Sequence, residues 1–133
     1  MHLKLYTDGA ARGNPGPAGA GALLLKPSGS VVAELSEYLG ETTNNVAEYK
    51  ALLLGLEKAL ALGASEIEIL ADSELIVRQL QGKYGVKNEG LKPLFQESVR
   101  LLRRFQKYSI NHIDREENEA ADRLANRAID ENC

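Results

Sequence analysis

Regular structure begins at Leu3-Lys4-Leu5-Tyr6-Thr7-Asp8-Gly9, where apolar and polar side chains alternate up to an acidic residue. Alternation with a period of two is typical of a half-buried β-strand, so we predict a strand over residues 3–8. The glycines and prolines of residues 9–19 predict a loop. Residues 20–25 and 31–38 have the composition of two further strands joined by a short turn. Together these segments predict an antiparallel three-stranded meander.

The hydrophobic period changes after the meander. Leu52, Leu56 and Leu60 recur every four residues and Gly63 follows them, which predicts a helix over residues 44–62. The same reasoning predicts helices over residues 73–81, 91–105 and 117–129, and strands over residues 66–71 and 108–113. This order predicts an α/β fold in which a five-stranded mixed sheet, a meander plus parallel strands, is flanked by helices.

The order of the elements also places two acidic residues. Two hairpins reverse the chain twice, and a helical crossover then returns it to a strand parallel to the first. If the strand over residues 66–71 lies beside the first strand, Asp8 and Asp72 meet at the same C-terminal edge of the sheet. Ligands of open α/β sheets bind at that edge.

Composition restricts the class of protein. With 133 residues, 44% of them hydrophobic, the chain fits one globular domain over residues 1–133. It contains no apolar run long enough to span a membrane and no signal peptide. The single cysteine, Cys133, excludes an internal disulfide, so we expect a reducing, cytoplasmic setting and no role for this thiol. An intermolecular bridge through Cys133 on oxidation is the alternative.

Charge is distributed unevenly along the chain. The net charge is −3, yet residues 78–107 contain eight Lys and Arg against two acids, a local charge of +6. This asymmetry favours one basic surface, suited to a polyanion, and a separate acidic cluster. A solvated basic helix face is the alternative interpretation.

Four carboxylates form the candidate acidic cluster: Asp8, Glu48, Asp72 and Asp122. Taken singly, Asp8 suits a turn, Asp72 suits a helix N-cap, and Asp122 suits a helix surface. Glu48 lies on the same stripe as Leu52 and Leu56, where a carboxylate is costly unless it is paired or binds a metal.

Taken together, the four acids indicate a metal site. Crowded carboxylates are tolerated around cations, and all-oxygen ligands favour Mg²⁺, with Mn²⁺ as an alternative and zinc disfavoured. Two such ions could activate water and stabilise the leaving oxygen of a phosphodiester.

Four ordered motifs over residues 3–126 resemble those of type 1 ribonucleases H. They are Thr7-Asp8-Gly9 with Gly13-Asn14-Pro15-Gly16-Pro17 and Gly19; Thr42-Thr43-Asn44-Asn45 with Glu48; Asp72-Ser73; and Arg115-Glu116 with Asn118-Glu119-Ala120-Ala121-Asp122-Arg123-Leu124-Ala125-Asn126. The resemblance implies a ribonuclease H-like fold and makes Asp8, Glu48, Asp72 and Asp122 metal-binding, catalytic residues.

The resemblance also implies substrate contacts. Asn14, Asn44 and Asn45 match positions that recognise RNA 2′-hydroxyls and neighbouring bases, and amides both donate to and accept from a hydroxyl. Thr43 matches a residue that helps to hold a DNA-strand phosphate, and Gly13 would let the backbone approach a ribose. A turn at Asn14 and helix capping by Asn44 or Asn45 are the alternatives.

The chain departs from the longer bacterial relatives in two respects. Only residues 82–90 separate the second and third predicted helices, so the basic protrusion that grips DNA is absent and weaker hybrid binding is expected. The auxiliary catalytic residue is also open between His112 and Arg115. We favour Arg115, because alternation places His112 near a strand end. An Arg115–Glu119 ion pair is the alternative role for this arginine.

The resulting hypothesis is an endonuclease that hydrolyses the RNA strand of RNA–DNA hybrids with two Mg²⁺ ions. The hybrid is the expected partner, and we expect neither membrane association nor an obligate protein partner. Relaxed activity that includes double-stranded RNA and a non-catalytic hybrid-binding module are the alternatives. The second is disfavoured, because a binder of polyanions has no use for a bare acidic cluster.

Overall fold

A computed structural model of the chain describes residues 1–132, so the expectations for Cys133 lie outside the described residues. One sheet has the strand order β3-β2-β1-β4-β5. Its strands are β1 (His2–Ala11), β2 (Gly16–Leu25), β3 (Val31–Thr42), β4 (Glu66–Ala71) and β5 (Lys107–His112). The helices are α1 (Asn44–Ala61), α2 (Glu74–Leu80), α3 (Lys92–Leu102), the 3₁₀ turn η1 (Arg115–Asn118) and α4 (Glu119–Asp130).

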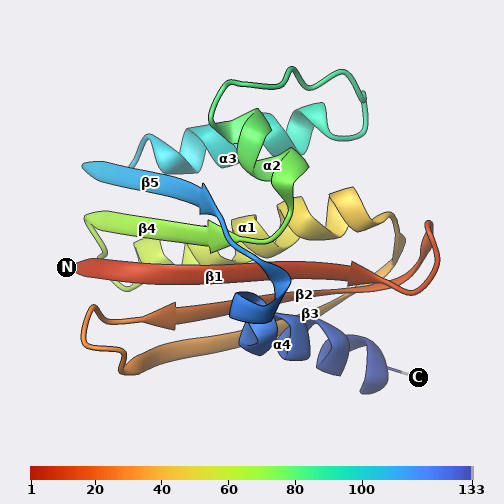
Figure 1. Cartoon of the computed structure of the whole chain (residues 1–133), viewed down its shortest axis with the longest axis horizontal. Coiled ribbons are helices and arrows are strands. Elements are labelled where there is room, and N and C mark those ends of the chain that lie inside the picture. Colours follow the sequence, from red (N-terminus) through yellow and green to blue (C-terminus); the bar gives the residue numbers. More distant parts are fainter. Residues whose placement is uncertain (133) are drawn as a thin grey trace.

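The sheet is mixed, as the sequence predicts. β1 pairs antiparallel with β2, and β2 pairs antiparallel with β3, which gives the predicted meander. β1 pairs parallel with β4, and β4 with β5, so β1, β4 and β5 end at the same side (Figure 1). Figure 1 also shows the layers: α1 and α3 lie behind the sheet and α4 crosses in front of it. The fold-class prediction is confirmed.

The predicted loop over residues 9–19 is wrong. β1 and β2 continue as a hairpin out to the pair Ala11–Ala18, which leaves only residues 12–15 between the strands. Gly9 and Gly19 in this stretch serve helix packing, whereas Gly13, with a φ of +110°, lies in the turn itself. A Cβ on Gly9 would lie 2.2 Å from the carbonyl carbon of Ala47 in α1, and one on Gly19 would lie 2.2 Å from the carbonyl oxygen of Ala125 in α4. Both helices therefore lie directly on the sheet backbone.

Helix α1 packs its apolar stripe on the sheet. Thr43 is the N-cap, and its hydroxyl accepts a hydrogen bond from the Val46 N–H at 3.3 Å. Leu52 and Leu56 are almost fully buried against β1, β2 and β4, and each contributes about 1.5–3 kcal/mol of transfer free energy. The buried Tyr49 hydroxyl donates to Gln79 Oε1 at 2.6 Å and so ties α1 to α2.

The third predicted helix, over residues 91–105, is shorter in the structure. α3 ends at Leu102, because the chain then turns so that Phe105 packs into the core and the Gln106 N–H donates to the Ser65 carbonyl at 2.8 Å. The last predicted helix, over residues 117–129, divides into η1 and α4. Among the described residues, no helix has the length and apolar character needed to cross a bilayer.

Candidate active site

An acidic pocket of about 500 Å³ opens where β4 ends beside β1. Thr7 of β1 is in register with Ala71 of β4, so the residues that follow them, Asp8 and Asp72, lie side by side as the topology predicts. Ligand oxygens of Asp8, Glu48 and Asp72 all lie within 4.8 Å of one another. The sheet thus supplies two of the three acids.

Helix α1 supplies the third acid, Glu48. The missing side chain of Gly9 lets α1 approach β1, and the Gly9 N–H donates a short hydrogen bond to Glu48 Oε1. This bond holds the carboxylate over the strand end. The sequence predicts the inward stripe on which Glu48 lies, and the Gly9 contact accounts for the orientation of its side chain.

Crowding and burial make the site unfavourable for negative charge. Burial raises the pKa of Asp8, and the neighbouring charges of Glu48 and Asp72 raise this pKa further. Burial also raises the pKa of Glu48, although the Gly9 N–H and the positive charge of Arg115 act in the opposite direction. A bound cation would reverse this penalty, because it favours the ionised carboxylates.

Asp122, from the first turn of α4, completes the wall of the pocket. It does not belong to the group of three whose oxygens lie within 4.8 Å. Its side chain nevertheless lies close enough to Asp8 to contribute to the raised pKa of that residue. All four predicted carboxylates therefore line one pocket.

The two candidates for the auxiliary residue occupy different places. Arg115, in η1, lines the pocket, and no salt bridge joins it to Glu119 within residues 1–132. His112 is the exposed last residue of β5, in register with Ala71, and is not part of the pocket wall. The geometry thus favours Arg115 over His112 as a group that can face a ligand in the pocket.

The predicted substrate-binding residues gather at one rim of the pocket. Asn14 Oδ1 accepts from the Asn44 N–H at 3.1 Å, and Asn44 Oδ1 accepts from the Ala11 N–H at 2.9 Å. Asn44 and Asn45 line the pocket, and Thr43, rather than either asparagine, caps α1. Gly13, in the turn between β1 and β2, has a φ of +110°, where a side chain would be strained. The rim is therefore a preformed loop-and-helix unit.

Asp72 does not cap helix α2, which was the alternative role for this residue. Ser73 caps α2, since its hydroxyl accepts from the Ile76 N–H at 3.4 Å, and the Asp72 carboxylate is left for the pocket.

Asn118 is a site residue to which the sequence analysis gives no role. Its side chain is 1% exposed, and Nδ2 donates to the Thr7 carbonyl at 2.8 Å and to Asp72 Oδ2 at 3.3 Å. It therefore fixes both the end of β1 and the orientation of Asp72. Its sequence signals are its place in the fourth motif and its position four residues before Asp122, and neither identifies partners 46 and 111 residues away.

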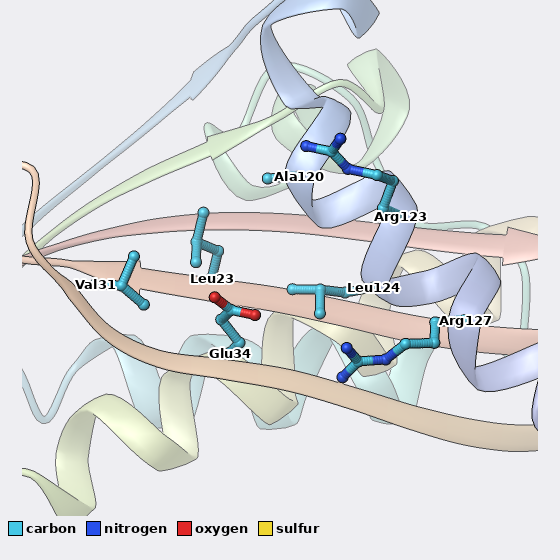
Figure 2. A pocket seen from close by; sticks show the side chains of 7 residues that line it. All are labelled: Leu23, Val31, Glu34, Ala120, Arg123, Leu124 and Arg127. Carbon is cyan, nitrogen blue, oxygen red and sulfur yellow. The ribbon is translucent and has the colours of Figure 1, made fainter.

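A second hollow, of about 410 Å³, lies on the α4 face of the sheet (Figure 2). Leu23, Val31 and Leu124 give it an apolar lining, and Arg123 and Arg127 come from α4. Glu34 is its single acidic residue, so it lacks the carboxylate cluster of the first pocket.

Comparisons with known proteins agree with this geometry. The family described as reverse transcriptase-like matches residues 6–128. A bifunctional protein of Mycobacterium tuberculosis is 43% identical over 131 residues, which is 98% of this chain but 36% of that protein. The chain thus spans about a third of the length of this relative.

Two solved structures cover the chain almost completely. RNase H1 from the halophilic archaeon Halobacterium salinarum superposes with a TM-score of 0.96 at 42% identity, covering 98% of this chain and 99% of that one. LC11-RNase H1 in complex with an RNA/DNA hybrid superposes with a TM-score of 0.93 at 46% identity and 98% coverage of both chains. From its sheet order, its carboxylate pocket and these similarities, the chain belongs to the ribonuclease H family.

Proposed function

We propose that the chain is an endonuclease that hydrolyses the RNA strand of RNA–DNA hybrids with the help of two divalent cations. One observation carries the proposal: Asp8, Glu48 and Asp72 hold their oxygens within 4.8 Å of one another in a pocket whose rim is formed by asparagines. The similarity to LC11-RNase H1, whose structure contains an RNA/DNA hybrid, supports the substrate.

The donor set fits Mg²⁺. Three crowded carboxylates, with Asp122 beside them, offer oxygen ligands alone, which hard cations prefer; Mn²⁺ shares this preference. The raised pKa values of Asp8 and Glu48 support a bound cation, because a cation would favour the ionised carboxylates. When bound, two such ions supply activation of a water and neutralisation of the charge that develops on the phosphodiester.

The remaining residues orient the substrate. The side-chain oxygens of Asn14 and Asn44 are occupied by backbone N–H groups, which leaves both NH₂ groups to donate to a 2′-hydroxyl. Asn45 makes no side-chain hydrogen bond within residues 1–132, so its amide can both donate and accept. Gly13 would let the turn approach the ribose. A 2′-hydroxyl is the group that distinguishes RNA from DNA, so this rim would select the strand that is cut.

Charge at two places would hold the phosphates. Thr43 stands at the N-terminus of the 18-residue α1, where backbone N–H groups and the helix dipole attract a DNA-strand phosphate. Arg115 faces the acidic cluster from the pocket wall. Because an arginine stays protonated, it can hold the scissile phosphate but cannot act as a general base. His112, outside the pocket wall, is the weaker candidate for this auxiliary role.

We also propose that the protein works in a reducing, cytoplasmic setting, which is supported by its single cysteine. The basic segment of residues 78–107 is the proposed contact for the DNA strand beyond the pocket.

A substrate panel tests the proposed function. End-labelled RNA–DNA hybrid, double-stranded RNA and single-stranded RNA are incubated with the protein in Mg²⁺, in Mn²⁺ and in chelator. We expect internal cuts in the RNA strand of the hybrid that require the metal. Cleavage of double-stranded RNA at a similar rate would replace the hybrid-specific function with a relaxed one. Tight hybrid binding without cleavage in either metal would make the chain a binding module.

A further inference from the structure

We propose that Asn126 is a positioning residue for Asp122 and that Arg12 fixes its orientation, so that the turn between β1 and β2 controls the fourth carboxylate of the site. This inference rests on the proposed function and deepens it, because it assigns roles to two residues outside the four carboxylates and the substrate-binding rim. It is carried by hydrogen bonds that join segments 114 residues apart in the sequence.

Asn126 stands one helical turn after Asp122 and contacts its carboxylate directly. The Asn126 amide Nδ2 donates to Asp122 Oδ1 at 3.2 Å and to the Asp122 carbonyl at 3.0 Å. The second bond anchors the amide on the helix backbone, and the first directs one carboxylate oxygen. Such an anchor matters most for Asp122, since this acid lies outside the 4.8 Å group that the other three form.

Arg12 determines which way the Asn126 amide faces. The Arg12 guanidinium donates to Asn126 Oδ1 at 3.3 Å, and a guanidinium has no acceptor. The oxygen of the amide must therefore face Arg12, which leaves the NH₂ group facing Asp122. Arg12 is itself held by Asp130 of α4 through an ion pair of 2.6 Å. Because this ion pair is half exposed, it adds little to the stability of the fold, but it holds the Arg12 guanidinium beside α4.

The same turn is tied to the other helix that supplies a carboxylate. Asn44, one turn before Glu48 in α1, bonds Asn14 through its N–H and Ala11 through its Oδ1. The turn over residues 12–15 is therefore bonded to α1 on one side and to α4 on the other. A substrate that binds at Gly13 or Asn14 and shifts this turn would change the orientation of the Asp122 carboxylate through Arg12 and Asn126.

The test removes the amide without changing the charge. Asn126→Leu keeps the branching at Cγ, with a somewhat larger side chain, and loses the donor. Asn132→Leu is the matched control, because Asn132 Nδ2 donates to the Ala128 carbonyl at 3.0 Å, the same bond to the residue four before it, with no carboxylate involved. Mn²⁺ binding to the metal-free proteins is measured by electron paramagnetic resonance without substrate. Hybrid cleavage is then measured as a function of Mg²⁺ concentration, and circular dichroism follows the fold.

We expect Asn126→Leu to weaken Mn²⁺ binding and to raise the Mg²⁺ concentration for half-maximal activity by about tenfold, the lower end of the range for groups that orient metal ligands. The KM for hybrid should stay near that of the wild type, and Asn132→Leu should change neither metal constant. Equal metal constants for Asn126→Leu, Asn132→Leu and wild type would overturn the inference.

A second variant keeps the inference testable if Asn126→Leu does not fold. Arg12→Ala changes an exposed turn residue and should weaken Mn²⁺ binding about twofold, the scale of an exposed polar contact. Loss of a positive charge alone would strengthen cation binding, so unchanged or stronger binding would contradict the role of Arg12. If the wild type cleaves hybrid but these variants match it, this inference alone fails; an inactive wild type refutes the proposed function instead.

Discussion

Replacing Asp8 by asparagine removes one negative charge from a cluster in which oxygens of Asp8, Glu48 and Asp72 lie within 4.8 Å of one another. At that separation, ionising Asp8 beside one charged neighbour costs about 3 kcal/mol at an effective dielectric constant of ~20, and about 1 kcal/mol at that of water. At pH 8 the metal-free wild type either bears this cost or keeps a proton on Asp8 that the unfolded chain would release, and asparagine does neither. We therefore expect Asp8→Asn to raise the free energy of unfolding of the metal-free protein by about 1–3 kcal/mol at pH 8. For a chain of this size the rise in Tm is roughly 4–12 °C.

The stability gained by Asp8→Asn should increase with pH. Burial first, and then Glu48, raises the pKa of Asp8 above its ordinary value of 3.8. Below about pH 4 this carboxyl is protonated in both the folded and the unfolded chain, so Asp8 costs the fold nothing there. As the pH rises toward the folded pKa, the unfolded chain releases the proton more readily and wild-type stability falls. The difference in Tm between Asp8→Asn and wild type should thus widen from pH 4 to pH 8.

The assay is thermal unfolding followed by circular dichroism in chelator at several pH values, repeated with Mg²⁺. Mg²⁺ should stabilise the wild type more than Asp8→Asn, since a ligand stabilises only the state that binds it. Glu37→Gln, at an exposed position of β3 outside the pocket, is the control and should change Tm little at any pH. A Tm for metal-free Asp8→Asn that lies several degrees below wild type at pH 8 would refute the repulsion argument.

Further predictions concern the auxiliary residue, the helix contact and the basic segment. Arg115→Ala should lower kcat about tenfold or more, or ~1.4 kcal/mol of barrier, and His112→Ala should lower it less; the reverse order at saturating hybrid would assign the role to His112. Gly9→Ala should destabilise the fold by about 1–3 kcal/mol in urea unfolding, because its Cβ would lie 2.2 Å from the Ala47 carbonyl carbon, and a neutral result would contradict the close packing of α1. A triple variant replaces three exposed basic residues, Arg103, Arg104 and Lys107, by alanine. It should raise KM for hybrid more than it lowers kcat, and it should reduce the salt dependence of binding. Unchanged constants would place the DNA contact elsewhere.

The sequence predicts the elements because local periodicity reports which face of each is buried. The strand over residues 66–71 matches β4 fully, and its parallel pairing with β1 follows from the crossover rule. The glycines of residues 9–19 mislead, since a glycine required by close helix packing looks the same in sequence as one required by a turn. Gly9 and Gly19 are explained only by the backbones of α1 and α4, which approach from distant parts of the chain.

In the active site, too, some residues can be predicted from the sequence and others cannot. Four carboxylates on two strand ends and two helices can be predicted from topology and motif, because each position follows from its own element. The groups that orient these carboxylates cannot be predicted in this way. Asn118 acts on a partner that is distant in sequence, and the effect of Asn126 depends on which way its side-chain amide faces. Asn118 bonds Asp72, 46 residues away, and the Asn126 amide is oriented by Arg12, 114 residues away.

If the acidic pocket is the catalytic centre for hydrolysis of RNA in hybrids, cleavage must depend on its carboxylates. Single-turnover cleavage of an end-labelled RNA–DNA hybrid in Mg²⁺, with wild type, Asp72→Asn and the exposed neighbour control Glu74→Gln, tests it most directly. We predict metal-dependent cuts in the RNA strand by wild type and Glu74→Gln, and loss of nearly all cleavage in Asp72→Asn while its fold persists. Cleavage by Asp72→Asn at the wild-type rate would mean that the acidic pocket is not the catalytic centre.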